Sequence, residues 1–421
     1  MRLKFAPIFI SILCFACLFK ANAQTTDTLS LTIQQAEDRF LKNNLSLIIQ
    51  KYNIDNANAQ IITARLFNNP DFSFSNGVFA TQVPNALSEQ SIGLSQLFTT
   101  AGKRNKNILL AKIGVQQAQY QFFDLLRTLK YSLRSDFYSI YFAQQSAAVY
   151  NQEITSLTTT LKVFREQYAK GNVAQKEVIR LQSQLYSLQS EYNSLLVGID
   201  STQSEFKLLI KATPATYVKP VYSYDLGSKT LVASTPYQKL LDSAYTNRYD
   251  LRLAKSVLDY NDLNLKLQKA TAVPDVSVSL NYDKLGSYGN NFIGAGLEFN
   301  LPFFNRNQGA IKQAYIAIDQ GKTQLQNQQN QVESDVATAY KGALRLENLY
   351  NSFDPQFKAD FTHLIQEVGK NYEKRNISLL EFLDFYDSYK TNTLQLNTIE
   401  LNRVTSLEQL NFVTGTPFFN R

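Results

Sequence analysis

Few side chains in this 421-residue sequence are of types suited to nucleophilic catalysis or to soft-metal binding. Both cysteines, Cys14 and Cys17, lie within the first 23 residues, Met1 is the one methionine, and His363 is the one histidine. A serine–histidine–acid mechanism would need His363, which lies in a polar stretch predicted to be helical, and the sequence contains no Gly-x-Ser-x-Gly turn. We therefore predict that the chain is not an enzyme, binds no cofactor or soft metal, and carries His363 on its surface.

The N-terminal residues indicate a secretory signal. Arg2 and Lys4 form a charged start, residues 5–19 are apolar, and Ala21-Asn22-Ala23 is a small-residue cleavage site. We expect residues 1–23 to be removed by cleavage after Ala23, with lipidation of Cys17 as the alternative. The apolar run is too short for a membrane helix, which needs roughly 20 residues, and no later segment approaches that length.

The net charge of +7 includes Arg2, Lys4 and Lys20, which leaves the mature chain near +4 (7 − 3). Charges of both signs are interspersed, so the sequence predicts no nucleic-acid partner. If the chain crosses a membrane, it must do so as β-strands, and therefore in an outer membrane.

Short motifs recur in the same order at an offset of roughly 200 residues, which indicates an internal duplication. Three pairs carry this inference: Asn69-Pro70-Asp71 with Val273-Pro274-Asp275, Gly102-Lys103-Arg104 with Phe304-Asn305-Arg306, and residues 168–173 with 372–377. We predict a first copy over residues 24–215 and a second over 236–421. A linker over 216–235, which contains Pro220 and Gly227, joins them.

Each copy is predicted to contain a helix, two strands and a long helical hairpin. The first helix is expected over about 32–66, and the hairpins over 103–210 and 306–414. Gly171 marks the first hairpin turn, and Asp354-Pro355 marks a break in the descending arm of the second hairpin. Apolar residues at spacings of three and four predict helices packed side by side. These stripes are Leu126, Leu129, Leu133, Phe137 and Ile140, and Leu181, Leu185, Leu188, Tyr192 and Leu195.

Four strands are predicted, at about 71–80, 89–98, 275–284 and 292–301. In the third, Val276, Val278 and Leu280 alternate with polar residues, which gives one apolar and one polar face. The pattern is typical of a tilted outer-membrane strand, and also of a soluble sheet that is half buried on a core. Four strands cannot close around water and open edges are not tolerated in lipid, so closure would need several chains.

With these features the sequence resembles the TolC family of outer-membrane efflux proteins over essentially the whole mature chain. The resemblance rests on residues 31–36, Asn43-Asn44-Leu45, residues 247–251, the Pro-Asp strand starts and the Tyr-x-x-Gly-Asn turn. It implies a mainly α-helical fold of duplicated units, with a periplasmic α-helical barrel and a 12-stranded β-barrel shared by a homotrimer in outer-membrane lipid. It also implies two partners, a periplasmic adaptor protein and an inner-membrane pump.

The resemblance further assigns roles to residues near the hairpin tips, whose side chains we expect to be exposed. The adaptor-contacting residues would be Lys170, Gly171, Asn172 and Val173, and Arg375, Asn376, Ile377 and Ser378. Glu381 and Asp384 match the pair of gating aspartates of the family, and they share one helix face because they are three residues apart. Two solvated charges on an amphipathic helix are the alternative interpretation.

The cargo is less narrowly predicted than the fold. Residues 377–386 resemble outer-membrane partners of resistance–nodulation–division pumps, which favours export of heavy-metal ions or drugs, and a duct for type I protein secretion is another alternative. Outside the family, the alternative is a soluble periplasmic coiled-coil scaffold or adaptor. The lipoyl-like or barrel-like β-domain typical of adaptors is not recognisable in the sequence.

Overall fold

The structure is a computed structural model, and it describes residues 27–77, 90–222, 231–286, 289–354, 356–374 and 376–419. The expected signal over 1–23, Pro355 and Arg375 therefore lie outside the described residues. The chain divides into two compact units, each built from three parts of the sequence. Unit 1 comprises Met1–Asn44, Ser132–Gly227 and Phe353–Asn402, and unit 2 comprises Leu45–Tyr131, Ser228–Ser352 and Arg403–Arg421. Each unit thus draws on both of the predicted copies.

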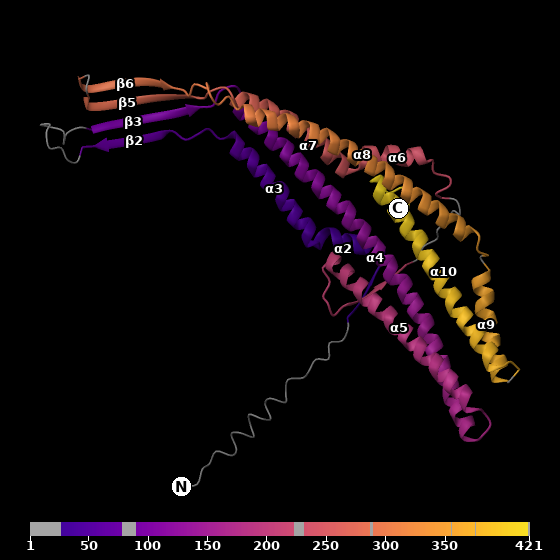
Figure 1. Cartoon of the computed structure of the whole chain (residues 1–421). Helices are drawn as coiled ribbons and strands as arrows, with labels where there is room; N and C mark the ends of the chain where they lie inside the picture. The colour runs from indigo at the N-terminus through magenta and orange to yellow at the C-terminus, as the bar shows by residue number, and fades with distance from the viewer. Residues whose placement is uncertain are drawn as a thin grey trace, which may run out of the picture. The chain divides into compact units, whose positions relative to one another are not determined.

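Unit 1 is built mainly from helices (Figure 1). Its elements are β1 (Thr28–Leu31), α2 (Ile33–Asn43), the C-terminal part of α4 (Lys103–Ala169), α5 (Gln175–Ile210), β4 (Tyr217–Pro220), α9 (Phe357–Glu373) and most of α10 (Leu379–Thr414). Helix α4 has 67 residues, so it is about 100 Å long at 1.5 Å per residue. Among the described residues, no helix is both long enough and apolar enough to cross a bilayer.

The stripes predicted to pack in the first hairpin are largely buried. Leu133, Phe137 and Ile140 of α4 have no exposed surface, and Leu181 and Leu188 of α5 are at most 1% exposed. The interpretation of these stripes as core packing is therefore confirmed.

A short strand lies where the sequence predicted the start of a linker. Strand β4 pairs in parallel with β1, which places Leu29 opposite Val218. The side chain of Val218 is fully buried, its amide donates to Oε1 of Gln203 at 3.1 Å, and its carbonyl accepts from Nε2 of Gln144 at 2.8 Å. The prolines suggested irregular structure. The strand forms nevertheless, because β1 and the side chains of Gln144 and Gln203, all distant in the chain, bond to its backbone.

The helix predicted over 32–66 is two helices, α2 and α3 (Leu45–Arg65), because Asn44 leaves the helical conformation. Its backbone is extended (φ −64°, ψ 119°), and its side-chain amide donates to the carbonyl of Leu209 at 3.0 Å. The second predicted copy has a break at the matching place, since Arg248 is also extended (φ −70°, ψ 122°) between α6 (Tyr237–Asn247) and α7 (Tyr249–Thr271). Arg248 is 4% exposed, and it binds Asp250 at 2.6 Å and Asp335 of α8 (Gln308–Asn351) at 2.8 Å.

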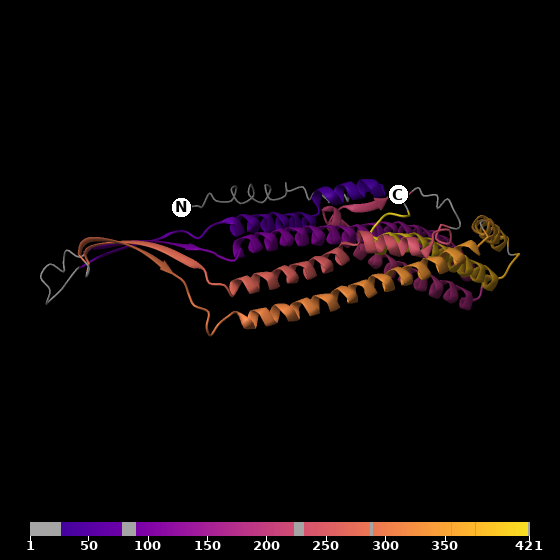
Figure 2. The ribbon, with the colours of Figure 1, turned by 90° about the horizontal axis from the view of Figure 1, so that it is seen from above.

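Unit 2 contains a four-stranded antiparallel sheet in the order β2-β3-β5-β6. Its strands are β2 (Asp71–Asn76), β3 (Gln90–Phe98), β5 (Val276–Gly286) and β6 (Gly289–Glu298). Figure 2 shows the sheet beyond one end of α3, α4, α7 and α8. Residues 78–80 of the first predicted strand lie outside the described residues.

Strand β6 begins and ends three residues earlier than the predicted span of 292–301. Its register is set by β5, in which Gly286 pairs with Gly289 and Ser277 pairs with Glu298. The apolar alternation continues to Leu301, but β5 begins at Val276 and supplies no partner beyond that point. Pairing, and not the apolar pattern, therefore decides where β6 ends.

Candidate functional site

The sheet of unit 2 has one continuous apolar face. Strand pairing arranges its side chains in two rows: Phe72, Leu94, Leu280 and Ala295, and Phe74, Ile92, Tyr282 and Ile293. In the single chain, Phe72 is 70% exposed, Leu280 54% and Ile293 75%. An apolar face of this extent marks a surface that contacts lipid or another chain.

The opposite face carries small and polar residues. Its two central rows are Ser73, Gly93, Asn281 and Gly294, and Ser95, Ser279 and Gly296. A Cβ atom on Gly93 would lie 2.4 Å from Oγ of Ser73, and one on Gly296 would lie 2.7 Å from Oγ of Ser279. A side chain at either position would therefore displace a serine hydroxyl on the neighbouring strand. The alternation seen in the sequence corresponds to two faces of opposite polarity.

The sheet is also incomplete at its sides. Within the described residues, the outer edges of β2 and β6 pair with no strand of this chain. Unpaired amides and carbonyls along an edge are a template for a strand of another chain. The single chain therefore leaves both an apolar face and two hydrogen-bonding edges to be covered.

The motifs that flank the strands meet at the helix end of the sheet. Lys103 Nζ binds Oδ1 of Asp275 at 2.8 Å and the carbonyl of Val273 at 2.6 Å, and the amide of Thr100 donates to the same carboxylate at 2.7 Å. These contacts join the Gly-Lys-Arg motif of the first predicted copy to the Pro-Asp motif of the second. Charge-assisted hydrogen bonds of this kind are among the stronger ones in proteins, and here they fix the start of β5 against the start of α4.

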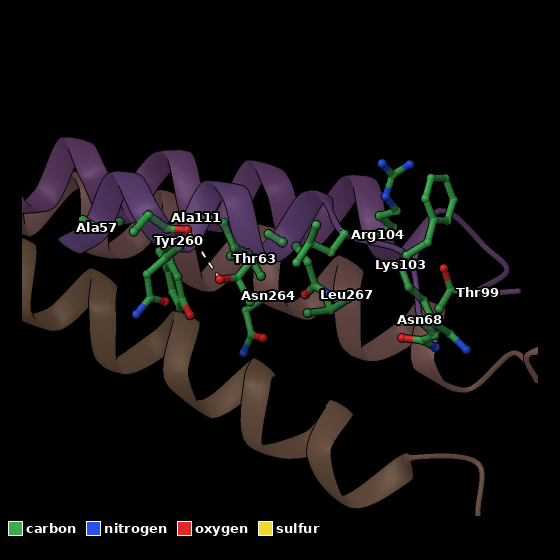
Figure 3. A pocket seen from close by; sticks show the side chains of 18 of the residues that line it. Ala57, Thr63, Asn68, Thr99, Lys103, Arg104, Ala111, Tyr260, Asn264 and Leu267 are labelled. Carbon is green, nitrogen blue, oxygen red and sulfur yellow. Dashed lines mark hydrogen bonds between the residues drawn. The ribbon is translucent and has the colours of Figure 1, made fainter. Parts of the chain in front are cut away.

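A groove of about 990 Å³ lies between α3, α4 and α7 in the same unit. Figure 3 shows the side chains from these helices that line it, among them Thr63, Ala111 and Asn264. Its charged lining residues are Lys103 and Arg104, and both already have hydrogen-bond partners. Lys103 binds Asp275 at 2.8 Å, and Arg104 donates to the carbonyl of Arg65 at 2.6 Å. The remaining lining residues carry amides, hydroxyls and apolar groups.

The first hairpin tip is a short turn between α4 and α5. Gly171 has φ +75°, a conformation that glycine adopts without strain, and the amide of Asn172 donates to the carbonyl of Gln167 at 2.9 Å. Lys170, Gly171 and Asn172 are exposed, whereas Val173 is partly buried. Val173 packs against the apolar cluster around Leu157, Leu161 and Leu185, so part of its surface is already used within the chain.

The second tip reproduces the bonding of the first. The amide of Asn376 donates to the carbonyl of Asn371 at 2.9 Å, five residues back, as Asn172 does in the first tip. The side chain of Asn376 also bonds that of Asn371 at 3.2 Å. Asn376 is exposed, whereas Ile377 is partly buried against the cluster that Val173 contacts. The backbone hydrogen bond at Asn376 therefore matches the one at Asn172 in the first tip.

Both proposed gate residues lie in the first turns of α10 with exposed side chains. Glu381 also has a local structural role, because its Oε2 accepts from the amide and from the hydroxyl of Ser378, each at 2.8 Å. The amide of Glu381 donates back to Oγ of Ser378 at 3.2 Å, which completes a capping box. The hydrogen bonds from the Ser378 amide and hydroxyl lower the pKa of Glu381.

Aromatic rings connect the two hairpins near the tips of unit 1. The rings of Tyr372 and Phe382 are stacked with centroids 4.1 Å apart, and Phe164 of α4 stacks on Tyr372 at 6.0 Å. Phe382 contacts Tyr386 at 4.5 Å, and the hydroxyl of Tyr386 lies 3.2 Å from Oγ of Ser156. The positions of α9 and α10 in this unit are therefore set by contacts with α4.

A buried group of charged side chains in unit 1 was not predicted from the sequence. Glu153 of α4 is 4% exposed and Lys390 of α10 is 7% exposed. Lys390 Nζ binds Glu191 of α5 and Asp387 of α10, each at 3.1 Å. The signal that could have revealed the group is that Glu153 lies beside Tyr150, Ile154 and Leu157, in a stretch of α4 that is otherwise apolar on this face.

Metal-ligating residues are scattered. Across the ranges that the structure describes, no three or more His, Cys, Asp or Glu side chains are grouped so as to hold a metal ion. His363 is exposed on α9, as the sequence predicted.

The chain is similar in sequence to a metal-resistance protein. No protein-family model matches the chain. The chain is 20% identical to the cobalt-zinc-cadmium resistance protein CzcC of Cupriavidus metallidurans over 297 residues, which cover 69% of this chain and 68% of that protein.

Solved outer-membrane proteins are similar over most of the chain. The CmeC outer membrane channel of Campylobacter jejuni matches with a TM-score of 0.75 at 15% identity, over 91% of this chain and 86% of that one. The outer membrane protein VceC of Vibrio cholerae matches with a TM-score of 0.71 at 15% identity, over 92% of this chain and 97% of that one. These similarities show that the chain has the fold of these proteins.

Proposed function

We propose that this chain, which has the fold of the TolC-type outer-membrane channels, is a subunit of a homotrimeric duct through which solutes leave the cell. The observation that carries the proposal is the sheet with one exposed apolar face, one face of small polar residues and two unpaired edges. In lipid every backbone donor and acceptor must be paired, so the edges of one chain have to meet those of another. Three chains with four strands each would supply a closed 12-stranded barrel in the outer membrane.

The helical part would lie in the periplasm and receive solutes from two partners. The proposal places a periplasmic adaptor at the hairpin tips, where Lys170, Gly171, Asn172 and Asn376 are exposed. Val173 and Ile377 pack on the apolar cluster, so they would support the shape of the tips as well as contact the adaptor. An inner-membrane pump would provide the energy, since nothing in a passive duct drives transport.

Heavy-metal ions are the cargo that we propose, delivered by a pump of the resistance–nodulation–division type. The support is the relative named for cobalt, zinc and cadmium resistance. Selectivity would belong to the pump and adaptor, because a duct needs no tight site for an ion that only passes through it.

The assembly can be tested on the full chain, expressed with its N-terminal residues and extracted from membranes in mild detergent. Native mass measurement is expected to show three chains, and the extracted protein is expected to form ion-conducting pores in planar bilayers. A stable monomer that is recovered without detergent, free of membranes, would overturn the proposal and favour the soluble scaffold.

A further inference from the structure

Glu153 is buried in unit 1 without full hydrogen bonding. Its side chain is 4% exposed, and its Oε1 atom has no hydrogen-bond partner. An ionised carboxylate in such a place is costly because it loses its water without gaining donors. The surroundings of Glu153 therefore favour its neutral, protonated form.

The groups that face Glu153 come from three helices. Tyr150 lies one turn earlier on α4, Glu191 lies on α5, and Asp387 and Lys390 lie on α10. The Lys390 ammonium already binds both Glu191 and Asp387 at 3.1 Å, and the hydroxyl of Tyr150 donates to Glu191 at 3.2 Å. A single ammonium group thus pairs with two carboxylates, and an ionised Glu153 would be a third carboxylate beside it.

These contacts determine the pH range over which Glu153 changes charge. The pKa of Glu153 is raised from 4.5 to about 8, mainly because the carboxyl is buried; Lys390 lowers it, and Asp387 and Glu191 raise it. Because the folded chain holds this proton more tightly than the unfolded chain, the packing is most stable at acidic pH. It weakens as pH rises from about 4.5 to about 8, and the cost is fully present above that value.

We propose that Glu153 is a proton-binding site that holds α10 against the α4–α5 hairpin when protonated and loosens this contact when ionised. Ionisation places a third negative charge beside one ammonium in a region closed to water, and outward movement of α10 relieves both the repulsion and the desolvation. The neighbouring carboxylates are more open, since the side chain of Glu191 is 42% exposed and that of Asp387 56%. Of the three carboxyl groups, that of Glu153 is therefore the one whose ionised form is least favourable in the packed structure.

Movement of α10 would reach the proposed gate, because Glu381 and Asp384 lie in the first turns of the same helix. This consequence rests on the proposed function, whereas the proton site rests only on contacts within unit 1. Protons would then close the periplasmic end, and rising pH would favour opening.

The inference can be tested with spin labels. Because Cys14 and Cys17 both precede the expected cleavage site, cysteines introduced by Thr158→Cys on α4 and Thr391→Cys on α10 would be unique in the mature chain. Both positions are exposed. Pulsed electron paramagnetic resonance in detergent is expected to show that a population with a longer α4–α10 distance grows by up to tenfold per pH unit below a midpoint near pH 8.

The variant Glu153→Gln, which stays neutral, is expected to hold the short distance from pH 6 to pH 9. Glu166→Gln, an exposed position on the same helix, is the matched control and should respond like the wild type. If Glu153→Gln fails to fold, Glu153→Met carries the same expectation. An unchanged wild-type distance between pH 6 and pH 9, or an unaltered pH response in the Glu153 variant, would overturn the inference. The readout needs no transport, so its failure is distinct from failure of the proposed duct.

Discussion

Glu381 has two roles that need to be separated, one in its helix and one in the proposed gate. Its carboxylate accepts two hydrogen bonds from Ser378 at the start of α10, so removing the side chain would disturb the first turn of the helix. Glutamine keeps an acceptor oxygen at this position and can maintain the capping box. Asp384, also exposed, lies one turn further along α10 and is the simpler probe of charge alone.

The gate assignment predicts an effect on ion selectivity with the fold retained. In a trimer, Glu381→Gln combined with Asp384→Asn would remove the ring of negative charge that concentrates cations at a constriction. We expect a several-fold fall in the cation-to-anion permeability ratio and weaker block by polyvalent cations added on the periplasmic side. Single-channel recording in planar bilayers measures both quantities.

Glu367→Gln is the control for the gate variants. Glu367 lies on α9 and pairs with Lys370 at 2.7 Å, and its side chain is 44% exposed, but it has no proposed place at the gate. If the double variant conducts with the selectivity of the Glu367 variant and the wild type, the assignment of Glu381 and Asp384 is wrong, although the duct itself could stand.

Each strand of the sheet presents alternate side chains to two different environments in the proposed barrel. In β5, Leu280 belongs to the apolar face and its neighbour Asn281 belongs to the polar face, and both are exposed in the single chain. Successive side chains of a strand point to opposite sides. In the proposed barrel, a substitution at one of these positions meets lipid and the same substitution at the next position meets water.

The two faces predict opposite outcomes for one substitution. Leu280→Arg would place a charge in lipid, at a cost of roughly 2–4 kcal/mol per chain near the bilayer centre, and the amount of trimer assembled in the outer membrane should fall. Asn281→Arg should assemble normally and reduce cation selectivity, because its charge faces the duct. Heat-modifiable mobility in gel electrophoresis, together with outer-membrane fractionation, measures the assembly. Equal loss of trimer in both variants would contradict this assignment of faces.

Considered as a whole, the molecule has the fold of the TolC-type outer-membrane channels, and the resemblance stated from the sequence is confirmed for the fold. The duplication, the signal at 1–23 and the roles of the tip residues stay predictions. The two compact units cut across the predicted copies, because α4 and α10 each contribute residues to both units. Each compact unit therefore contains residues of both predicted copies.

A prediction at this scale concerns metal ions. If the duct exports metals, the purified mature protein should bind them weakly, because after cleavage it has no Cys or Met to act as a soft ligand and has His363 as its one imidazole. Isothermal calorimetry with Cu(I) or Ag(I) is expected to show no binding in the micromolar range, and His363→Ala should not change the result. Micromolar binding that is abolished in the His363 variant would show that the duct itself holds its cargo.

Features that depend on residues close together in the chain were predictable from the sequence. The alternation of Val276, Val278 and Leu280, the leucine stripes of α4 and α5, and the uninterrupted length of α4 are local patterns, and each follows from the geometry of one element. The resemblance supplied the assembly and the partners, which no local pattern contains.

Features made by residues distant in the chain depended on the tertiary structure. Strand β4 forms where prolines suggested a linker because β1 lies nearly 190 residues earlier and pairs with it. Glu153 is buried together with Lys390, although the two residues are more than 200 positions apart in the chain. The sequence by itself determined the long helices, the four strands of the larger sheet and the faces they present, because these depend on neighbours within a few residues. Only the tertiary structure decided which charges are buried together, because burial and pairing depend on segments that the chain brings together after the elements exist.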